Sequence, residues 1–181
     1  MAEGIDPKFS MDGSVVEGLF VRELKPTGAF KEALKRIGLD TERLDPKYSE
    51  ETFKNAIDLA AAHAYPGLSV FDAHFKLGEQ LIAGYFSTIL GRITAGIIPV
   101  IGVKRTIARV SQLWTVPQPG MRISSTETPT EWLLNFQNTA MSADLVAGIV
   151  QAALRRADPK IVAKVVMRAP GSGQISVPLA R

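Results

Sequence analysis

The chain has 181 residues and a net charge of +3, with 22% charged and 46% hydrophobic residues, which is the size and balance of one folded domain. It contains no cysteine, so the sequence excludes disulfides, thiolate catalysis, Fe–S clusters and thiolate zinc sites. Residues 1–100 carry 11 Lys/Arg and 14 Asp/Glu, whereas residues 101–181 carry 10 and 4, so the basic character belongs to the second part.

Residues 1–13 are expected to form a flexible leader ahead of a single domain over residues 14–181. The first ten residues are polar and lack the apolar core of a secretory signal. Together with the absence of cysteine, this favours a cytoplasmic protein.

Helical spacing of apolar residues dominates the chain up to residue 113. Candidate caps are Thr27, Ser49, Ser69 and, further along the chain, Ser142 at helix starts, and Gly38 at a helix end. The pattern predicts helices over about 15–24, 28–37, 50–64 and 70–95, and then a short basic helix through Ile107, Val110 and Leu113.

The helix expected over 70–95 carries apolar residues most of the way round, so it should lie at the centre of the fold. Its glycines, among them Gly78 and Gly84, are costly in a helix and suggest that a neighbour comes close to its backbone. Residues 81–101 are long enough to cross a membrane, but Arg92, three glycines and Pro99 favour a buried core helix.

After Trp114 the apolar residues alternate, which is the spacing of strands. Two strands around a turn at Thr128-Pro129, a helix near 143–156, and two strands around Gly171–Gly173 give the order β-β-α-β-β. The sequence therefore predicts an α+β fold, with an N-terminal helical bundle followed by a four-stranded antiparallel sheet. One alternate set of residues should face inward from this sheet: Trp132, Leu134, Phe136, Ile161, Val165, Ile175 and Val177.

No catalytic or metal-binding motif is present, so an enzyme is not the favoured reading and no catalytic residue is expected. His63 and His74 are the only histidines, and their spacing matches no metal site. We therefore expect no metal and no cofactor. The basic residues after Lys104 lack the aromatic residues that accompany them in single-strand binders, so nucleic acid is an unlikely partner.

Five stretches, residues 16–30, 65–69, 77–92, 118–121 and 145–150, together resemble a family of uncharacterised proteins of similar length found in myxobacteria. That resemblance implies no activity. The predicted order of elements is also similar to transport-particle/vinyl-reductase-like and haem nitric-oxide-binding sensor domains, which hold small ligands between helices and sheet. The haem-binding pattern Tyr-x-Ser-x-Arg is matched only in part, because Ile89 stands where the resemblance requires arginine.

Two functions remain open from the sequence. The first is a non-enzymatic sensory or regulatory module that binds a small apolar or acidic ligand between the long helix and the sheet. Tyr85, Ser87 and Arg92 would bind that ligand, since Tyr85 and Arg92 are two helical turns apart and should share a face. The second is a protein–protein interaction module without a small ligand, either a homodimer or a partner of another protein, which would use Trp114, Leu113 and the turn at 117–120.

Overall fold

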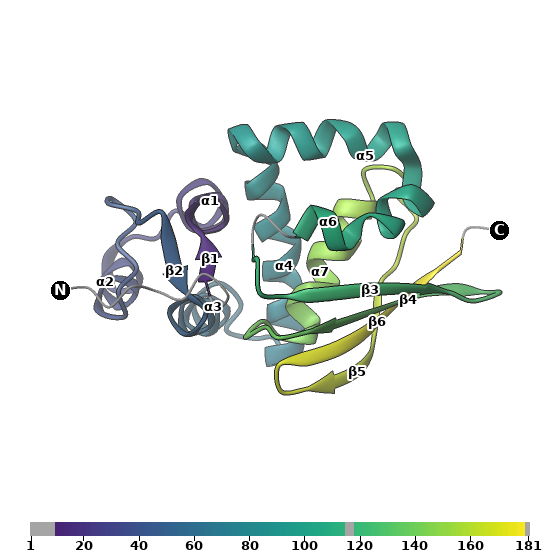
Figure 1. The fold of residues 1–181 in the computed structure, drawn as a ribbon. Helices are drawn as coiled ribbons and strands as arrows, with labels where there is room; N and C mark the ends of the chain where they lie inside the picture. Colours follow the sequence, from purple (N-terminus) through teal and green to yellow (C-terminus); the bar gives the residue numbers. More distant parts are fainter. Residues whose placement is uncertain (1–9, 115–117, 180–181) are drawn as a thin grey trace.

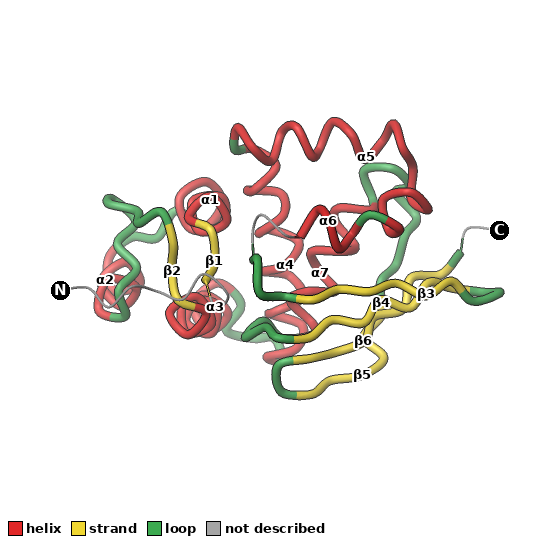
Figure 2. The backbone as a smooth tube through the Cα atoms, in the orientation of Figure 1, coloured by secondary structure: helices red, strands yellow, loops and turns green. Residues whose placement is uncertain are grey.

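The computed structural model describes residues 10–114 and 118–179, in which a helical N-terminal part precedes a sheet covered by helices (Figure 1). Its helices are α1 (Gly13–Val16), the π-helix η2 (Glu17–Leu24), α2 (Gly28–Arg36), α3 (Glu50–Ala64), α4 (Val70–Ser87), α5 (Ile89–Ala108), α6 (Val110–Trp114) and α7 (Ala143–Leu154). Its strands are β1 (Ser10–Asp12), β2 (Lys47–Ser49), β3 (Arg122–Glu127), β4 (Glu131–Gln137), β5 (Lys164–Ala169) and β6 (Ser172–Pro178). The predicted α+β class is confirmed, and Figure 2 shows the helices in red and the strands in yellow.

The start of the described chain is ordered, which corrects part of the leader expected over residues 1–13. Residues 1–9 lie outside the described residues. Ser10–Asp12, however, form β1 and pair antiparallel with β2, so that Met11 lies opposite Tyr48. Met11 is buried in the main hydrophobic core, which explains why this short strand is held in place.

Side-chain caps start three helices where the sequence predicts them, at Ser49, Ser69 and Ser142, whereas Thr27 precedes α2 without a capping hydrogen bond from its side chain. The Ser49 hydroxyl accepts a hydrogen bond from the Thr52 amide at 3.0 Å at the start of α3. The Ser142 hydroxyl accepts one from the Leu145 amide at 3.2 Å at the start of α7. Gly38 has a φ of 90°, a left-handed conformation that suits the residue after a helix end.

The long helix expected over 70–95 is two helices, because Thr88 interrupts it. Thr88 has an extended backbone, and its hydroxyl donates to the Tyr85 carbonyl at 2.7 Å and accepts from the Gly91 amide at 3.1 Å. One side chain thus ends α4 and caps α5. Among the described residues, no single helix is both long enough and apolar enough to cross a membrane. The helices α4 and α5 have that length and apolarity only when they are taken together, and the angle between them is 105°.

The sequence correctly indicated that glycines let neighbours approach α4. A Cβ on Gly78 would lie 2.1 Å from the Leu145 carbonyl oxygen of α7, and a Cβ on Gly84 would lie 2.1 Å from the Gly18 carbonyl oxygen of η2. Contacts this short leave no room for a side chain, so α4 is in backbone contact with a helix on each of two sides.

The sheet has the strand order β3-β4-β6-β5, and each neighbouring pair is antiparallel. Its inner face packs against α6 and α7 (Figure 1). Six of the seven residues predicted to face inward are buried, and Val165 is half-buried. The predicted four-stranded antiparallel sheet is therefore confirmed, although Ile161 is buried just before β5 and not on a strand of the sheet.

Candidate ligand-binding site

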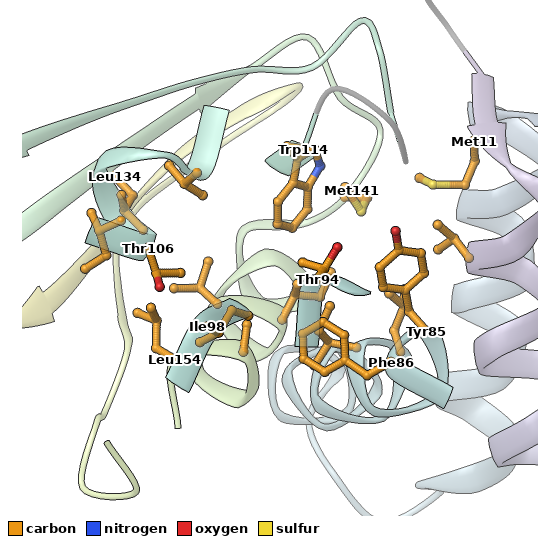
Figure 3. A pocket seen from close by; sticks show the side chains of 18 residues that line it. Met11, Tyr85, Phe86, Thr94, Ile98, Thr106, Trp114, Leu134, Met141 and Leu154 are labelled. Atoms are coloured by element: carbon orange, nitrogen blue, oxygen red, sulfur yellow. The ribbon is translucent and has the colours of Figure 1, made fainter. Parts of the chain in front are cut away.

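An apolar cavity of about 80 Å³ lies where α4, α5, α6, α7 and β4 meet. Residues from five helices, from β1 and β4, and from the loop before α7 line it (Figure 3): Met11, Val15, Leu81, Ile82, Tyr85, Phe86, Thr94, Ile98, Thr106, Ile107, Val110, Trp114, Leu134, Met141, Ile149, Val150, Ala153 and Leu154. The cavity thus lies between the helices and the sheet, the region in which the sequence hypothesis places a ligand. We call it the apolar cavity.

Few polar groups face the apolar cavity, and they come from different helices. Figure 3 shows the hydroxyls of Tyr85 and Thr94 on the side of the cavity near Trp114 and Met141. Burial raises the pKa of the Tyr85 phenol, the Asp12 carboxylate acts in the same direction, and a hydrogen bond with Thr94 opposes both. Tyr85 is therefore a neutral hydrogen-bonding group at physiological pH.

The Trp114 indole N–H is the polar group of the cavity that lacks a partner. It is buried and makes no hydrogen bond to any residue that the structure describes. A buried N–H without an acceptor costs roughly 1–3 kcal/mol, so a ligand that supplies an acceptor would recover that energy. The sequence hypothesis placed Trp114 on a surface patch, whereas the structure places it half-buried against this cavity, and residue 117 of that patch lies outside the described residues.

The three ligand-binding residues expected from the sequence lie apart in the structure. Tyr85 lines the cavity, but the Ser87 hydroxyl donates to the Gly84 carbonyl at 2.6 Å and does not line it. Arg92 is exposed, and its Nε donates to the Ser87 carbonyl at 3.2 Å. The expected shared face of Tyr85 and Arg92 is absent because the chain bends at Thr88, between them.

A second, more polar cavity of about 470 Å³ opens between α3, α4 and the start of α7. In it, His74 Nδ1 lies 2.8 Å from the Ser142 hydroxyl, and His74 Nε2 lies 3.2 Å from Asp58 Oδ1. The order Ser–His–Asp is that of a catalytic triad, but the details are those of a structural contact. The Ser142 hydroxyl also caps α7, and His74 Nε2 has no hydrogen bond of acceptable geometry to Asp58.

On the other side of this polar cavity an ion pair fixes α7 to the sheet. Arg168 of β5 donates from Nε and Nη2 to the two carboxylate oxygens of Asp144, at 2.9 and 2.7 Å. The same guanidinium lies 4.8 Å from the centre of the Phe71 ring of α4. Sequence spacing offers no sign of this contact, because the two charged residues belong to different elements. Around the polar cavity, the Arg168–Asp144 pair therefore links β5 to α7, whereas His74 Nε2 is left without a hydrogen bond to any described residue.

Solved H-NOX domains have a fold similar to that of this chain. An H-NOX protein from S. oneidensis in the Fe(II) ligation state is 12% identical, with a TM-score of 0.72 over 94% of this chain and 97% of that chain. An oxygen-binding H-NOX domain related to soluble guanylate cyclases is 14% identical, with a TM-score of 0.64 over 92% and 90% of the two chains. Identities this low establish a common fold and nothing about function.

A structure solved to probe haem distortion in the H-NOX family is also 14% identical, with a TM-score of 0.67 over 94% of this chain and 98% of that chain. The model of a family described as a protein of unknown function, DUF2378, matches residues 10–174. No curated protein matches the sequence. The resemblance to an uncharacterised family, and the fold likeness to haem nitric-oxide-binding domains, are both confirmed.

Proposed function

We propose that this chain, which belongs to the DUF2378 family of unknown function, is a sensory module. Its apolar cavity would bind a small apolar ligand. The observation that carries the proposal is the unpartnered Trp114 N–H in an otherwise apolar, buried space. Binding sites for small molecules combine an apolar lining with a few polar groups that fix orientation.

Haem, named for the H-NOX structures, does not fit the residues around this cavity. His63 stacks on Phe30 with 4.3 Å between ring centres, and His74 contacts Ser142, so both histidines are engaged away from the cavity. Tyr85 and Met11 belong to residue types that can bind iron, but no Lys or Arg among the described lining residues could pair with haem propionates. The volume of about 80 Å³ is also well below the roughly 300–1,000 Å³ of pockets for larger ligands.

The ligand that suits this cavity has only a few heavy atoms, is mainly apolar, and carries one hydrogen-bond acceptor. The indole N–H of Trp114 and the phenol of Tyr85 would donate to that acceptor, while aliphatic side chains of α5 and α7 surround the remainder. Short ketones and aldehydes have this chemistry. An acidic ligand is not favoured, because the lining offers it no cation and an unpaired buried carboxylate is costly.

A thermal-shift titration with a series of 2-ketones, from acetone to 2-octanone, tests the proposal. We expect the melting temperature to rise with ligand concentration, because a ligand bound only by the folded state stabilises it. The effect should increase with chain length until the cavity is filled, and then fall.

Two neighbouring isoleucines of α5 supply matched variants. Ile98 is buried and lines the cavity, whereas Ile97 is 42% exposed and does not. Ile98→Phe should fill the cavity and remove the response to ketones, and Ile97→Phe should leave it unchanged. Trp114→Phe should weaken the response by removing the donor. If no ketone shifts the melting temperature of the wild-type protein, the ligand proposal fails and the interaction module takes its place.

A further inference from the structure

The outer face of α5 carries a stripe of large aliphatic side chains that no other described element covers. Figure 1 shows α5 along the upper edge of the molecule, with its inner side toward α4 and α7. The exposed side chains recur every three or four residues and therefore lie on one face of the helix. They are Ile89 (82% exposed), Ile93 (64%), Ile97 (42%) and Val100 (83%).

This stripe has no role in the packing of the chain. The opposite face of α5 supplies the packing, since Thr94 and Ile98 line the apolar cavity. Single exposed aliphatic residues are common on protein surfaces, but four in register on one helix form a contiguous patch, and such patches mark interaction sites.

The charged residues in α5 and in the sequence on either side of it are of one sign. Residues 80–126 contain five Lys/Arg and no Asp/Glu. Arg92 is exposed beside the stripe, and Arg105 and Arg109 are exposed beyond its end, without an ion pair to any described residue. Lys104 is the exception, because it is paired with Glu127 at 2.9 Å. The exposed charged residues in and directly after α5 are therefore all basic, with Arg92 before the bend at Gly102 and the others after it.

We propose that α5 lies flat on an anionic lipid surface as far as its bend at Gly102, with its isoleucines inserted between the headgroups and the arginines beside and beyond the stripe contacting them. Helices that bind at a membrane interface combine these two features, an apolar face and flanking Lys or Arg. A second copy of the chain fits the face less well, because a two-fold interface would bring the same unneutralised cations together. Four side chains also provide much less than the ~800 Å² per partner of a stable interface. The proposal uses only the outer face of α5 and does not depend on the ligand.

Vesicle flotation with the full chain tests this docking. Vesicles of phosphatidylcholine alone are compared with vesicles that contain about 30% phosphatidylserine, at about 0.1 M and about 1 M NaCl. We expect binding only to the anionic vesicles, and loss of most of it at high salt. Arg105→Gln with Arg109→Gln should lower the partition coefficient about 30-fold, because each basic residue near such a surface contributes about fivefold.

The apolar part of the contact is tested by Ile93→Glu with Val100→Glu, which should abolish flotation. Leu68→Glu is the matched control, because Leu68 is 47% exposed in the turn before α4 and lies outside the stripe. Circular dichroism establishes that all the variants are folded. Absence of flotation of the wild-type protein with anionic vesicles, or equal loss of flotation in the Leu68→Glu control, would overturn the proposal. So would a wild-type dimer in light scattering that Ile93→Glu converts to a monomer, since the face would then belong to a second copy.

Discussion

Helices α5 and α7 form two walls of the same cavity, yet the chain holds them in very different ways. Residues 143–151 of α7 are buried without exception, and α7 contacts α4 on one side and the sheet on another. α5 is covered on one face only, contains Pro99, and bends at Gly102, whose φ is 75°. One wall is therefore fixed by packing along its length, while the other is covered on one face and changes direction at each end of its apolar half, at Thr88 and Gly102.

The largest effect is expected where α7 touches α4. A Cβ on Gly148 would lie 2.0 Å from the Phe75 carbonyl oxygen, so Gly148→Leu forces the two backbones apart. We expect the free energy of unfolding to fall by at least about 2–3 kcal/mol, the cost of overpacking a dense core. Urea denaturation followed by circular dichroism measures it. Gly84→Leu should behave in the same way, because the Gly18 carbonyl of η2 lies as close.

A second effect should arise where α7 meets β5. Asp144 is buried and accepts two hydrogen bonds from Arg168, so Asp144→Ala leaves the cation without its partner and removes a carboxylate from the first turn of the helix. The free energy of unfolding should fall by about 2 kcal/mol. Glu42→Ala, which removes an exposed ion pair with Lys31, is the control and should change it by less than about 1 kcal/mol. Equal losses in the two variants would mean that α7 is not specially anchored there.

On α5, replacing a glycine should increase the free energy of unfolding instead of lowering it. A Cβ on Gly96 would meet nothing within 4 Å, so Gly96→Ala adds no clash and reduces the entropy that the backbone loses on folding. We expect the free energy of unfolding to rise by roughly 0.5–1 kcal/mol. If urea melts showed a loss instead, the outer side of α5 would have to be covered, and the contrast with α7 would disappear.

The smallest effect concerns pH. Burial raises the pKa of the Tyr85 phenol, so the folded state favours the neutral form, and its stabilising effect is complete below the ordinary pKa of about 10. Stability is lost as pH rises from about 10 through the raised pKa of the folded protein. A difference titration at 295 nm between wild type and Tyr85→Phe should show this late ionisation. An ordinary pKa for Tyr85 would mean that α5 exposes the cavity to water much of the time.

The sheet and its core were predictable because apolar and polar residues alternate in each of the segments that form the two pairs of strands. That alternation is consistent with only one assignment of inward-facing side chains. Trp132, Leu134 and Phe136 must share a face, and the caps at Ser49 and Ser142 are local signals of helix starts. Such patterns depend on neighbouring residues, so one sequence is enough to show them.

The site was predictable only in its location. In the sequence, Thr88 is a single polar residue within an apolar segment. In the structure, its extended backbone ends α4, so Arg92 does not share a helical face with Tyr85. The approach of Trp114 to the cavity, and of Arg168 to Asp144, depends on how whole elements pack. The one usable clue was the dipeptide Ser87-Thr88, since Ser and Thr favour helix starts.

The strand order has a consequence for synthesis on the ribosome. β6 lies between β4 and β5, so both of these strands expose an unpaired edge until residues 172–178 have left the ribosome. The pairing of Glu131 with Pro178 joins distant parts of the chain and should form late. During that interval the aromatic and aliphatic side chains of β4 lack their neighbours from β6, and an open edge of this kind is a template for aggregation. The nascent chain is therefore expected to need a chaperone more than the finished protein does.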